Sequence, residues 1–338
     1  MSVAAPPSVS IPLETAYAAC EAIARREAKN FYYAFRVLPR EKREAICAVY
    51  AFMRHADDLA DDERLTLEQR LLNTEQWIKE WHHAARGEAT DNPVFIALRD
   101  AQQRFDISTD LLDQLLHGTM MDLMPGDLSA QGPHVERISA GGAILDVYRN
   151  FDDLYRYCYY VASVVGLVCI RIFGYNDASA EKLAEETGIA FQLTNILRDV
   201  REDVERKRVY LPLDELRKYN VTAEQLFSNR GERRLTPEER GLMELQASRA
   251  RHYYAAADAL LPLISPDSRA ALWVLVAIYR RLLECIETAR YEVFSARIKV
   301  STAEKLWILL RGFWMGFRLR LSRRHQASFK RTSQDRKI

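Results

Sequence analysis

The sequence has few residues that interrupt helices and no pattern of a fibrous or repetitive protein. Only 13 of its 338 residues are glycine and 11 are proline, which is little for an all-β chain of this length. It contains no internal repeat and no sustained alternation of polar and apolar residues. With 48% hydrophobic and 28% charged residues, the composition excludes a disordered chain. It favours a helical globular protein with a large buried core.

Paired cysteines and net charge are also lacking. The five cysteines are odd in number and form no Cys-x-x-Cys pair, so reduced thiols are expected rather than a disulfide framework. The 48 basic and 47 acidic residues leave a formal charge of +1, which provides no overall field that would recruit nucleic acid. Any binding site for a polyanion must therefore be local.

Export signals and long apolar runs are missing as well. Residues 1–12 contain three prolines but no basic segment followed by an apolar one, so they predict a disordered N-terminal arm rather than a signal peptide. The longest apolar run, residues 157–170, has 14 residues, and a membrane span requires roughly 20. We interpret this run as a buried helix and expect a cytoplasmic protein.

Apolar residues recur at helical spacing from residue 13 onward. Helix-ending signals such as Pro39, Pro93 and Pro212 separate segments of about 12 to 25 residues. The expected fold class is therefore all-α. We expect one helical domain over residues 13–321, followed by a basic tail over residues 322–338.

The C-terminal segment combines apolar and basic residues. Trp307, Leu310, Phe313 and Trp314 recur at spacings of three and four, and Asp335 is the only acid from residue 311 onward. This pattern is typical of a basic amphipathic helix. One interpretation is contact with an anionic membrane surface, at the inner face of the membrane. The other is a terminal core helix with a solvated basic tail.

A first pair of carboxylates continues the apolar helix predicted around residues 46–53. Asp57 and Asp61 are four residues apart, so on a helix they share one face at about 6 Å. Like charges at this spacing repel one another unless a cation neutralises them. The alternative is a solvated helix end, although acids at that end oppose the helix dipole.

A second set of polar residues lies in the segment from residue 188 to 203. Asn195, Asp199 and Asp203 recur at intervals of four, and the apolar residues between them predict a mostly buried helix. Buried carboxylates require partners. Two such sets on facing helices can hold Mg²⁺ through oxygen atoms and leave coordination positions for substrate phosphate. The implied substrate is a diphosphate.

Two further patterns bear on this hypothesis. A di-iron bundle also places acids on facing helices, but it requires two Glu-x-x-His pairs, and only Glu80 and His83 have that spacing. Arg208 belongs to a basic run one turn past Asp203. It could close over a bound diphosphate with paired donors, or the run could simply complement a helix dipole.

Taken together, these motifs resemble those of the squalene/phytoene synthase family. Residues 188–212 and 157–166 resemble the two family signatures, and residues 30–54 resemble its first substrate-binding stretch with the aspartate motif. Residues 291–305 resemble its closing helices. The resemblance runs from about residue 20 to 312.

The resemblance implies a single isoprenoid-synthase-type helical domain with a central cavity, in which two aspartate motifs bind diphosphate through Mg²⁺. It implies a head-to-head condensation of two prenyl diphosphates with release of diphosphate. The implied metal ligands are Asp57, Asp61, Asn195, Asp199 and Asp203. The implied catalytic residues are Asp57, Asp61, Tyr157, Asp199 and Asp203. The implied substrate-binding residues are Phe31, Phe35, Tyr50, Arg54, Val161, Gln192, Arg198, Arg208 and Tyr210.

This chemistry suits the residue types. Ionisation of an allylic diphosphate produces a carbocation, which aromatic faces stabilise and which water would trap. Phe31, Phe35 and Tyr157 could wall a dry cavity, although a cavity wall and a packed core have the same sequence pattern. Ser163 and Thr187 depart from the family's usual residues, which affects pocket shape rather than ligands or charge.

The expected reaction joins two farnesyl diphosphates to presqualene diphosphate or squalene, because Phe31 and Phe35 are bulky and favour a fifteen-carbon substrate. Phytoene synthesis from two geranylgeranyl diphosphates, or dehydrosqualene synthesis, is the alternative. NADPH use stays open, since the sequence contains no Gly-x-Gly-x-x-Gly loop. The chain could act as a monomer or as a homodimer.

Overall fold

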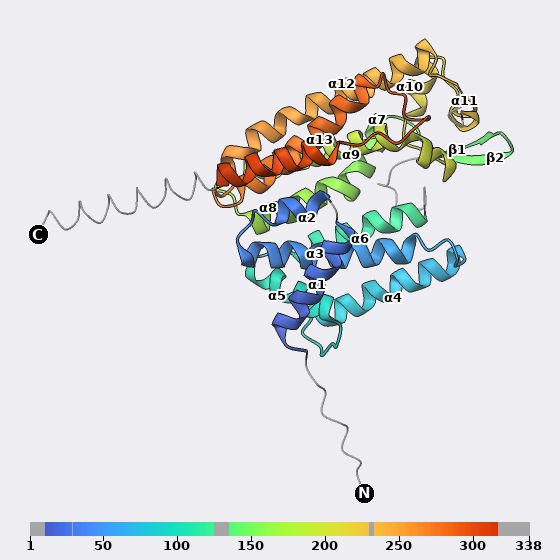
Figure 1. Cartoon of the computed structure of the whole chain (residues 1–338). Coiled ribbons are helices and arrows are strands. Elements are labelled where there is room, and N and C mark those ends of the chain that lie inside the picture. Colours follow the sequence, from blue (N-terminus) through green and yellow to red (C-terminus); the bar gives the residue numbers. More distant parts are fainter. Residues whose placement is uncertain (1–10, 29, 125–134, 230–232, 317–338) are drawn as a thin grey trace, which may run out of the picture. The chain divides into compact units, whose positions relative to one another are not determined.

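The structure is a computed structural model, and it describes residues 11–28, 30–124, 135–229 and 233–316. The chain forms two compact units, Met1–Leu123 and Met124–Ile338, each described by itself (Figure 1). The predicted basic tail, residues 322–338, and most of the predicted N-terminal arm lie outside the described residues.

The first unit consists of helices. They are α1 (Leu13–Glu27), α2 (Asn30–Phe35), α3 (Arg40–Ala60), α4 (Leu67–Ala85), α5 (Pro93–Arg104) and α6 (Thr109–Leu123). Helix α3 is central, because it packs against α1, α4, α5 and α6. Its Phe52 has ring centroids of Trp77, Trp81 and Phe95 within 5.8, 5.2 and 6.3 Å. This aromatic cluster fixes α3, which carries the first aspartate pair.

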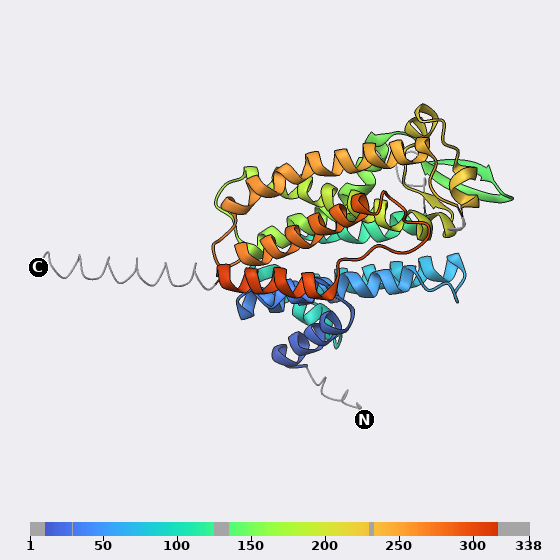
Figure 2. The ribbon, with the colours of Figure 1, turned by 45° about the horizontal axis from the view of Figure 1, so that its top comes forward.

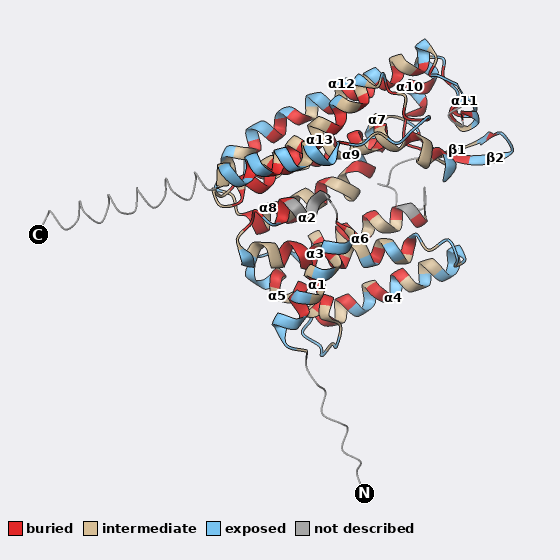
Figure 3. Cartoon of the chain, in the orientation of Figure 1, coloured by how far each residue is buried: buried red, intermediate tan, exposed pale blue. Residues whose placement is uncertain are grey.

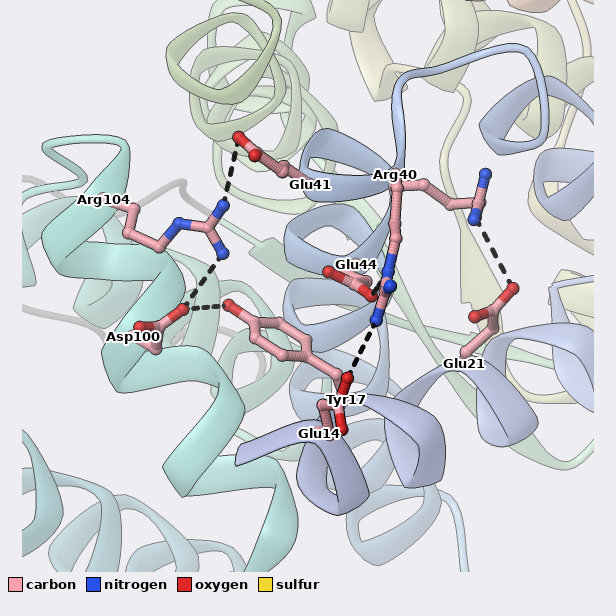
Figure 4. A network of polar contacts seen from close by, with 9 residues as sticks. Glu14, Tyr17, Glu21, Arg40, Glu41, Glu44, Asp100 and Arg104 are labelled. Atoms are coloured by element: carbon pink, nitrogen blue, oxygen red, sulfur yellow. Dashed lines mark hydrogen bonds and ion pairs between the residues drawn. The ribbon is translucent and has the colours of Figure 1, made fainter. Parts of the chain in front are cut away.

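A polar network joins α1, α3 and α5 (Figure 4). The Tyr17 hydroxyl donates to Asp100 at 2.6 Å, and Arg104 pairs with both Asp100 and Glu41 at 3.3 Å. Burial and the hydrogen bond to Asp100 raise the pKa of Tyr17. The pairs are partly exposed, so each one adds little stability, and their main effect is to set how the three helices align.

The second unit contains helices and three short strands. Its elements are β1 (Val135–Ala140), β2 (Ala143–Tyr148), α7 (Phe151–Cys158), η1 (Tyr159–Ser163), α8 (Val164–Phe173), α9 (Ser179–Glu205), β3 (Arg208–Val209), α10 (Leu213–Lys218), α11 (Ala223–Ser228), α12 (Pro237–Leu260), η2 (Leu261–Leu263), α13 (Arg269–Thr288) and a helix over residues 302–316. The all-α class predicted from the sequence is confirmed.

Helix α9 is the centre of the second unit, where it packs against α12, α8, α13 and the π-helical turn η1 (Figures 1 and 2). Buried residues follow its length (red in Figure 3). Gly188 allows the approach to η1, since a Cβ atom there would lie 2.5 Å from the Cα atom of Ser163. The Ser163 hydroxyl donates to the backbone carbonyl of Glu185 at 2.7 Å. The serine that departs from the family pattern therefore helps to fasten η1 to α9.

The continuous segment Phe151–Phe173 combines α7, η1 and α8. Among the described residues, it is the one helical segment long and apolar enough to cross a membrane by length and composition alone. In its most apolar window, 44% of the residues are buried within the structure. The segment packs against α9, which agrees with our interpretation of a core helix.

The hairpin of β1 and β2 was not expected from helical periodicity. Its strands pair in antiparallel register from Val135 with Tyr148 to Ala140 with Ala143. The turn uses Gly141 and Gly142 at φ values of 55° and 79°, in the left-handed region that glycine adopts easily. Strand β3 adds to β2 in parallel. The hairpin thereby holds the residues that follow α9.

Candidate functional site

The first aspartate pair lies at the C-terminal end of α3. Asp57 is half-buried, and its Oδ1 atom accepts a hydrogen bond from the Thr119 hydroxyl of α6 at 3.1 Å. Asp61 is exposed and follows the last residue of α3, and its backbone N–H donates to the Asp57 carbonyl at 2.8 Å. Helical geometry therefore continues through both residues, and the predicted spacing on one face holds.

Two predicted substrate-binding residues precede this pair on α3. Arg54 pairs with Asp58 at 2.5 Å. Burial lowers the pKa of Arg54, but the hydrogen bond and charge of Asp58 outweigh it and raise that pKa overall. Tyr50 is half-buried, and burial raises its pKa. Arg54 is thus a fixed cation one helical turn before Asp57, a position from which it can contact a bound anion.

The aromatic residues assigned to the substrate lie on α2. Phe35 is buried, with 5% of its surface exposed. The side chain of Phe31 lies outside the described part of the structure. The cavity-wall role of both residues stays a prediction.

The second set of polar residues lies on α9, as predicted. Asn195, Asp199 and Asp203 are all half-buried and occupy successive turns of this helix. Asp199 accepts hydrogen bonds from both nitrogens of the Arg198 fork, the Nε contact being 2.7 Å. The amide nitrogen of Asn195 donates to the side-chain oxygen of Gln192 at 3.4 Å. Helix α9 therefore carries five of the predicted residues, which are Gln192, Asn195, Arg198, Asp199 and Asp203. Asn195, Asp199 and Asp203 form one stripe along it, the α9 stripe.

Tyr279 of α13 supports this stripe from the core. Its ring stacks on Phe191 with centroids 4.3 Å apart, and it forms a hydrogen bond with Asn195. Burial raises the pKa of Tyr279, while the Asn195 hydrogen bond and the charge of Arg198 lower it. The contact fixes the side chain of Asn195 in one orientation.

Near the α9 stripe, the structure shows basic side chains to which the sequence analysis assigned no role. Arg297, in the segment after α13, pairs with Asp199 at 2.9 Å and with Glu202 at 3.7 Å. The pKa of Lys305 is lowered by burial and by the nearby charges of Lys299 and Arg198. Cations held this close together favour an anionic ligand. Their signal in the sequence was the basic run from residue 297 to 305, which only the fold brings to α9.

Tyr157 and Tyr210 meet in the core of the second unit. Their rings stack with centroids 4.8 Å apart, and the Tyr157 hydroxyl donates to that of Tyr210 at 3.0 Å. Tyr148 of β2 completes the cluster, with its ring 5.3 Å from that of Tyr157. Nothing in the sequence pointed to Tyr148, because its role depends on the hairpin. Val161 lies half-buried in η1.

Arg208 does not continue the helix that carries Asp203. Helix α9 ends at Glu205, and Lys207 has a φ of 65°, which turns the chain into β3. Arg208 then pairs in register with Asp146 of β2. It is half-buried and held by a strand, so the interpretation that it complements a helix dipole does not apply.

The oxygen atoms of these side chains are the groups that could bind a divalent cation. Among the described residues, no group of three or more His, Cys, Asp and Glu side chains is arranged as a metal site. The α9 stripe nevertheless offers only oxygen ligands, and the Oδ1 atom of Asn195 is buried without a hydrogen-bond partner in the described structure. Hard cations such as Mg²⁺ prefer such ligands and take the remainder from water and substrate phosphate. The residues of α9 therefore fit a magnesium ion.

Comparison with known proteins places these motifs in a family. The sequence model described as "Squalene/phytoene synthase" matches residues 24–304. The 15-cis-phytoene synthase of Synechococcus elongatus is 32% identical over 318 residues, which are 90% of this chain and 95% of that protein. The phytoene synthase of Mycobacterium tuberculosis is 35% identical over 304 residues, covering 87% of this chain and 89% of that protein.

Solved structures agree with the sequence matches. A dehydrosqualene synthase crystallised with a ligand superposes with a TM-score of 0.74 at 30% identity, covering 89% of this chain and 96% of that one. The squalene synthase HpnC of Alicyclobacillus acidocaldarius has a TM-score of 0.70 at 24% identity, covering 83% and 97% of the two chains, which supports the shared fold alone.

Proposed function

The chain belongs to the squalene/phytoene synthase family of prenyltransferases, and from this premise we propose that it condenses two allylic prenyl diphosphates head to head in a magnesium-dependent reaction. The observation that carries this proposal is the polar stripe of α9. It combines three oxygen-bearing side chains on successive turns with the paired cations Arg198 and Arg297. A stripe of this kind in a buried helix is explained by a diphosphate and its counter-ions.

Asn195, Asp199 and Asp203 on α9, and Asp57 and Asp61 on α3, are the residues of each unit that would hold Mg²⁺, which would supply positive charge to a diphosphate leaving group. The chain's own cations extend this effect. Arg198 and Arg297 offer paired donors to phosphate oxygens, and Lys305 adds a compact positive charge. Such preorganised groups stabilise charge that develops as the carbon–oxygen bond breaks.

The tyrosine cluster can stabilise the carbocation that remains after the diphosphate has left. Tyr157 and Tyr210 are buried, with 4% and 7% of their surfaces exposed, so the rings lie in a medium from which water is largely excluded. A cation over an aromatic face is stabilised most when it is desolvated. The hydrogen bond between the two hydroxyls keeps both rings in place.

For the substrate, we favour two geranylgeranyl diphosphates and a phytoene product, because the relatives at 32% and 35% identity are named phytoene synthases. Two farnesyl diphosphates, the substrate expected from the sequence, form the second candidate. The match to a dehydrosqualene synthase and the bulky, buried Phe35 favour this shorter substrate.

The deciding experiment incubates the purified chain with each prenyl diphosphate and Mg²⁺, with and without NADPH, and identifies the product by mass. A forty-carbon hydrocarbon supports the first candidate, and a thirty-carbon product or presqualene diphosphate supports the second. If neither substrate yields a head-to-head product, the proposal is wrong.

Asp199→Asn tests the site itself. It should lower turnover by at least about 100-fold, as the loss of other groups that stabilise a developing charge does, while the circular dichroism spectrum stays unchanged. Glu205→Gln is the matched control, because it removes a carboxylate from an exposed position on the same helix. Equal activities of the two variants would refute the role of Asp199.

A further inference from the structure

The helix over residues 302–316 is fastened to α13 by one of its faces. Ser301 and Glu304 form a capping box at its start, with backbone-to-side-chain distances of 3.1 and 3.2 Å. Gly312 lies so close to α13 that a Cβ atom there would be 2.3 Å from a methyl group of Val274. Arg281 of α13 binds Glu304 at 2.7 Å. The helix therefore has a fixed inward face.

Its outward face is apolar and exposed. Five large hydrophobic side chains, with 46 to 63% of their surfaces exposed, belong to this helix. They are Leu306, Trp307, Leu310, Phe313 and Trp314. Their spacing of one, three and four residues places them on one side of the helix. Single exposed hydrophobic residues are common, but a contiguous group of five marks a contact surface.

The composition around this face indicates which surface it contacts. Two of the five side chains are tryptophans, which prefer the boundary between an apolar phase and water. Arg311 is exposed on the same helix. The sequence from residue 317 to 338 contains eight arginines and lysines against Asp335 as its only acid, in a chain whose overall charge is +1.

We propose that the apolar face of residues 302–316 docks onto a lipid bilayer that contains anionic headgroups, with the following basic sequence as its electrostatic partner. Apolar insertion and charge attraction add in such contacts. A second copy of the chain is a poorer occupant, because a two-fold contact through this face would bring two strongly basic stretches together.

The test is cosedimentation of the full chain with two kinds of phosphatidylcholine vesicles, one of which also contains about 30 mol% phosphatidylglycerol as the anionic lipid. We expect binding to the anionic vesicles that weakens in high salt. Trp307→Ser combined with Trp314→Ser should weaken binding by about tenfold or more. Leu67→Ser combined with Leu72→Ser is the matched control, since both leucines are exposed on α4 and should leave binding unchanged.

Circular dichroism establishes that the variants fold, and sedimentation velocity reports the oligomeric state. Replacing Arg323 and Arg324 by glutamine gives a second test that spares the helix, and it should reduce binding to anionic vesicles only. Absence of vesicle binding by the wild-type chain would overturn the proposal. So would a wild-type dimer that the tryptophan substitutions dissociate without any change in lipid binding.

Discussion

Replacing Gly188 by alanine should separate α9 from the π-helical turn η1. The added Cβ atom would lie 2.5 and 2.8 Å from the Cα and N atoms of Ser163 and 2.9 Å from the carbonyl carbon of Ala162. All three are backbone atoms, so no side-chain rotation can relieve the overlap. One of the two helical segments must therefore move.

The magnitude follows from two opposing effects. Overpacking of a core costs about 1 to 3 kcal/mol, and contact with backbone on three atoms puts this site at the upper end. Alanine recovers about 1 kcal/mol over glycine through its helix propensity. We expect a net loss of roughly 2 kcal/mol in the free energy of unfolding. Turnover should fall as well, because the displaced helix carries Asn195 and Asp199.

Gly241→Ala is the matched control. Gly241 also lies inside a helix, but its added Cβ atom would meet only the ring of Tyr219, at 3.1 and 3.3 Å. A half-buried side chain can move by a few tenths of an ångström, so the gain in helix propensity should leave this variant as stable as the wild type or slightly more so. Urea unfolding followed by circular dichroism measures both. If Gly188→Ala unfolds at the same urea concentration as Gly241→Ala, the close packing of α9 on η1 does not limit stability.

Two further predictions concern charge. Arg297→Gln removes an ion pair in which the arginine side chain is 47% exposed, so the free energy of unfolding should change by less than about 1 kcal/mol. Steady-state kinetics should show a KM for the prenyl diphosphate raised by about tenfold, and an unchanged KM would contradict contact of Arg297 with the substrate. Burial in the folded protein lowers the pKa of His117 from 6.5. As the pH falls below about 6.5, the unfolded chain therefore binds a proton at His117 more readily than the folded one, and the stability of the wild type should decline. Thermal unfolding from pH 7.5 to 5 should show a smaller decline for His117→Gln, and parallel profiles of the two proteins would disprove the effect.

The helices could be predicted because each carries a local signal. The apolar stripe of α9 and the spacing of Asn195, Asp199 and Asp203 require only helical periodicity, which the sequence displays directly. The same holds for α3 and its aspartates. The helical position of both aspartate motifs was therefore predicted correctly, whereas their role and their meeting across a cavity stay predictions.

The hairpin was not predicted because its strands are only six residues long and their alternation of polar and apolar residues is weak. β1 reads Val-Glu-Arg-Ile-Ser-Ala, and its pairing with β2 becomes visible only through the Gly141-Gly142 turn. Tyr148 and the strand position of Arg208 both depend on this hairpin. Residues that reach a site through long-range pairing leave no local pattern from which they could be inferred.

Arg297 illustrates a different limit, one set by charge rather than by secondary structure. Asp199 and Glu202 lie one turn apart on α9, and without a cation their repulsion would destabilise the half-buried stripe. Arg297 supplies that cation from a segment almost 100 residues later in the chain. Because the Arg297 side chain is 47% exposed, we expect it to leave Asp199 when another cation binds there. It would then be a donor for phosphate, so we expect one residue to stabilise the stripe without ligand and to bind the substrate.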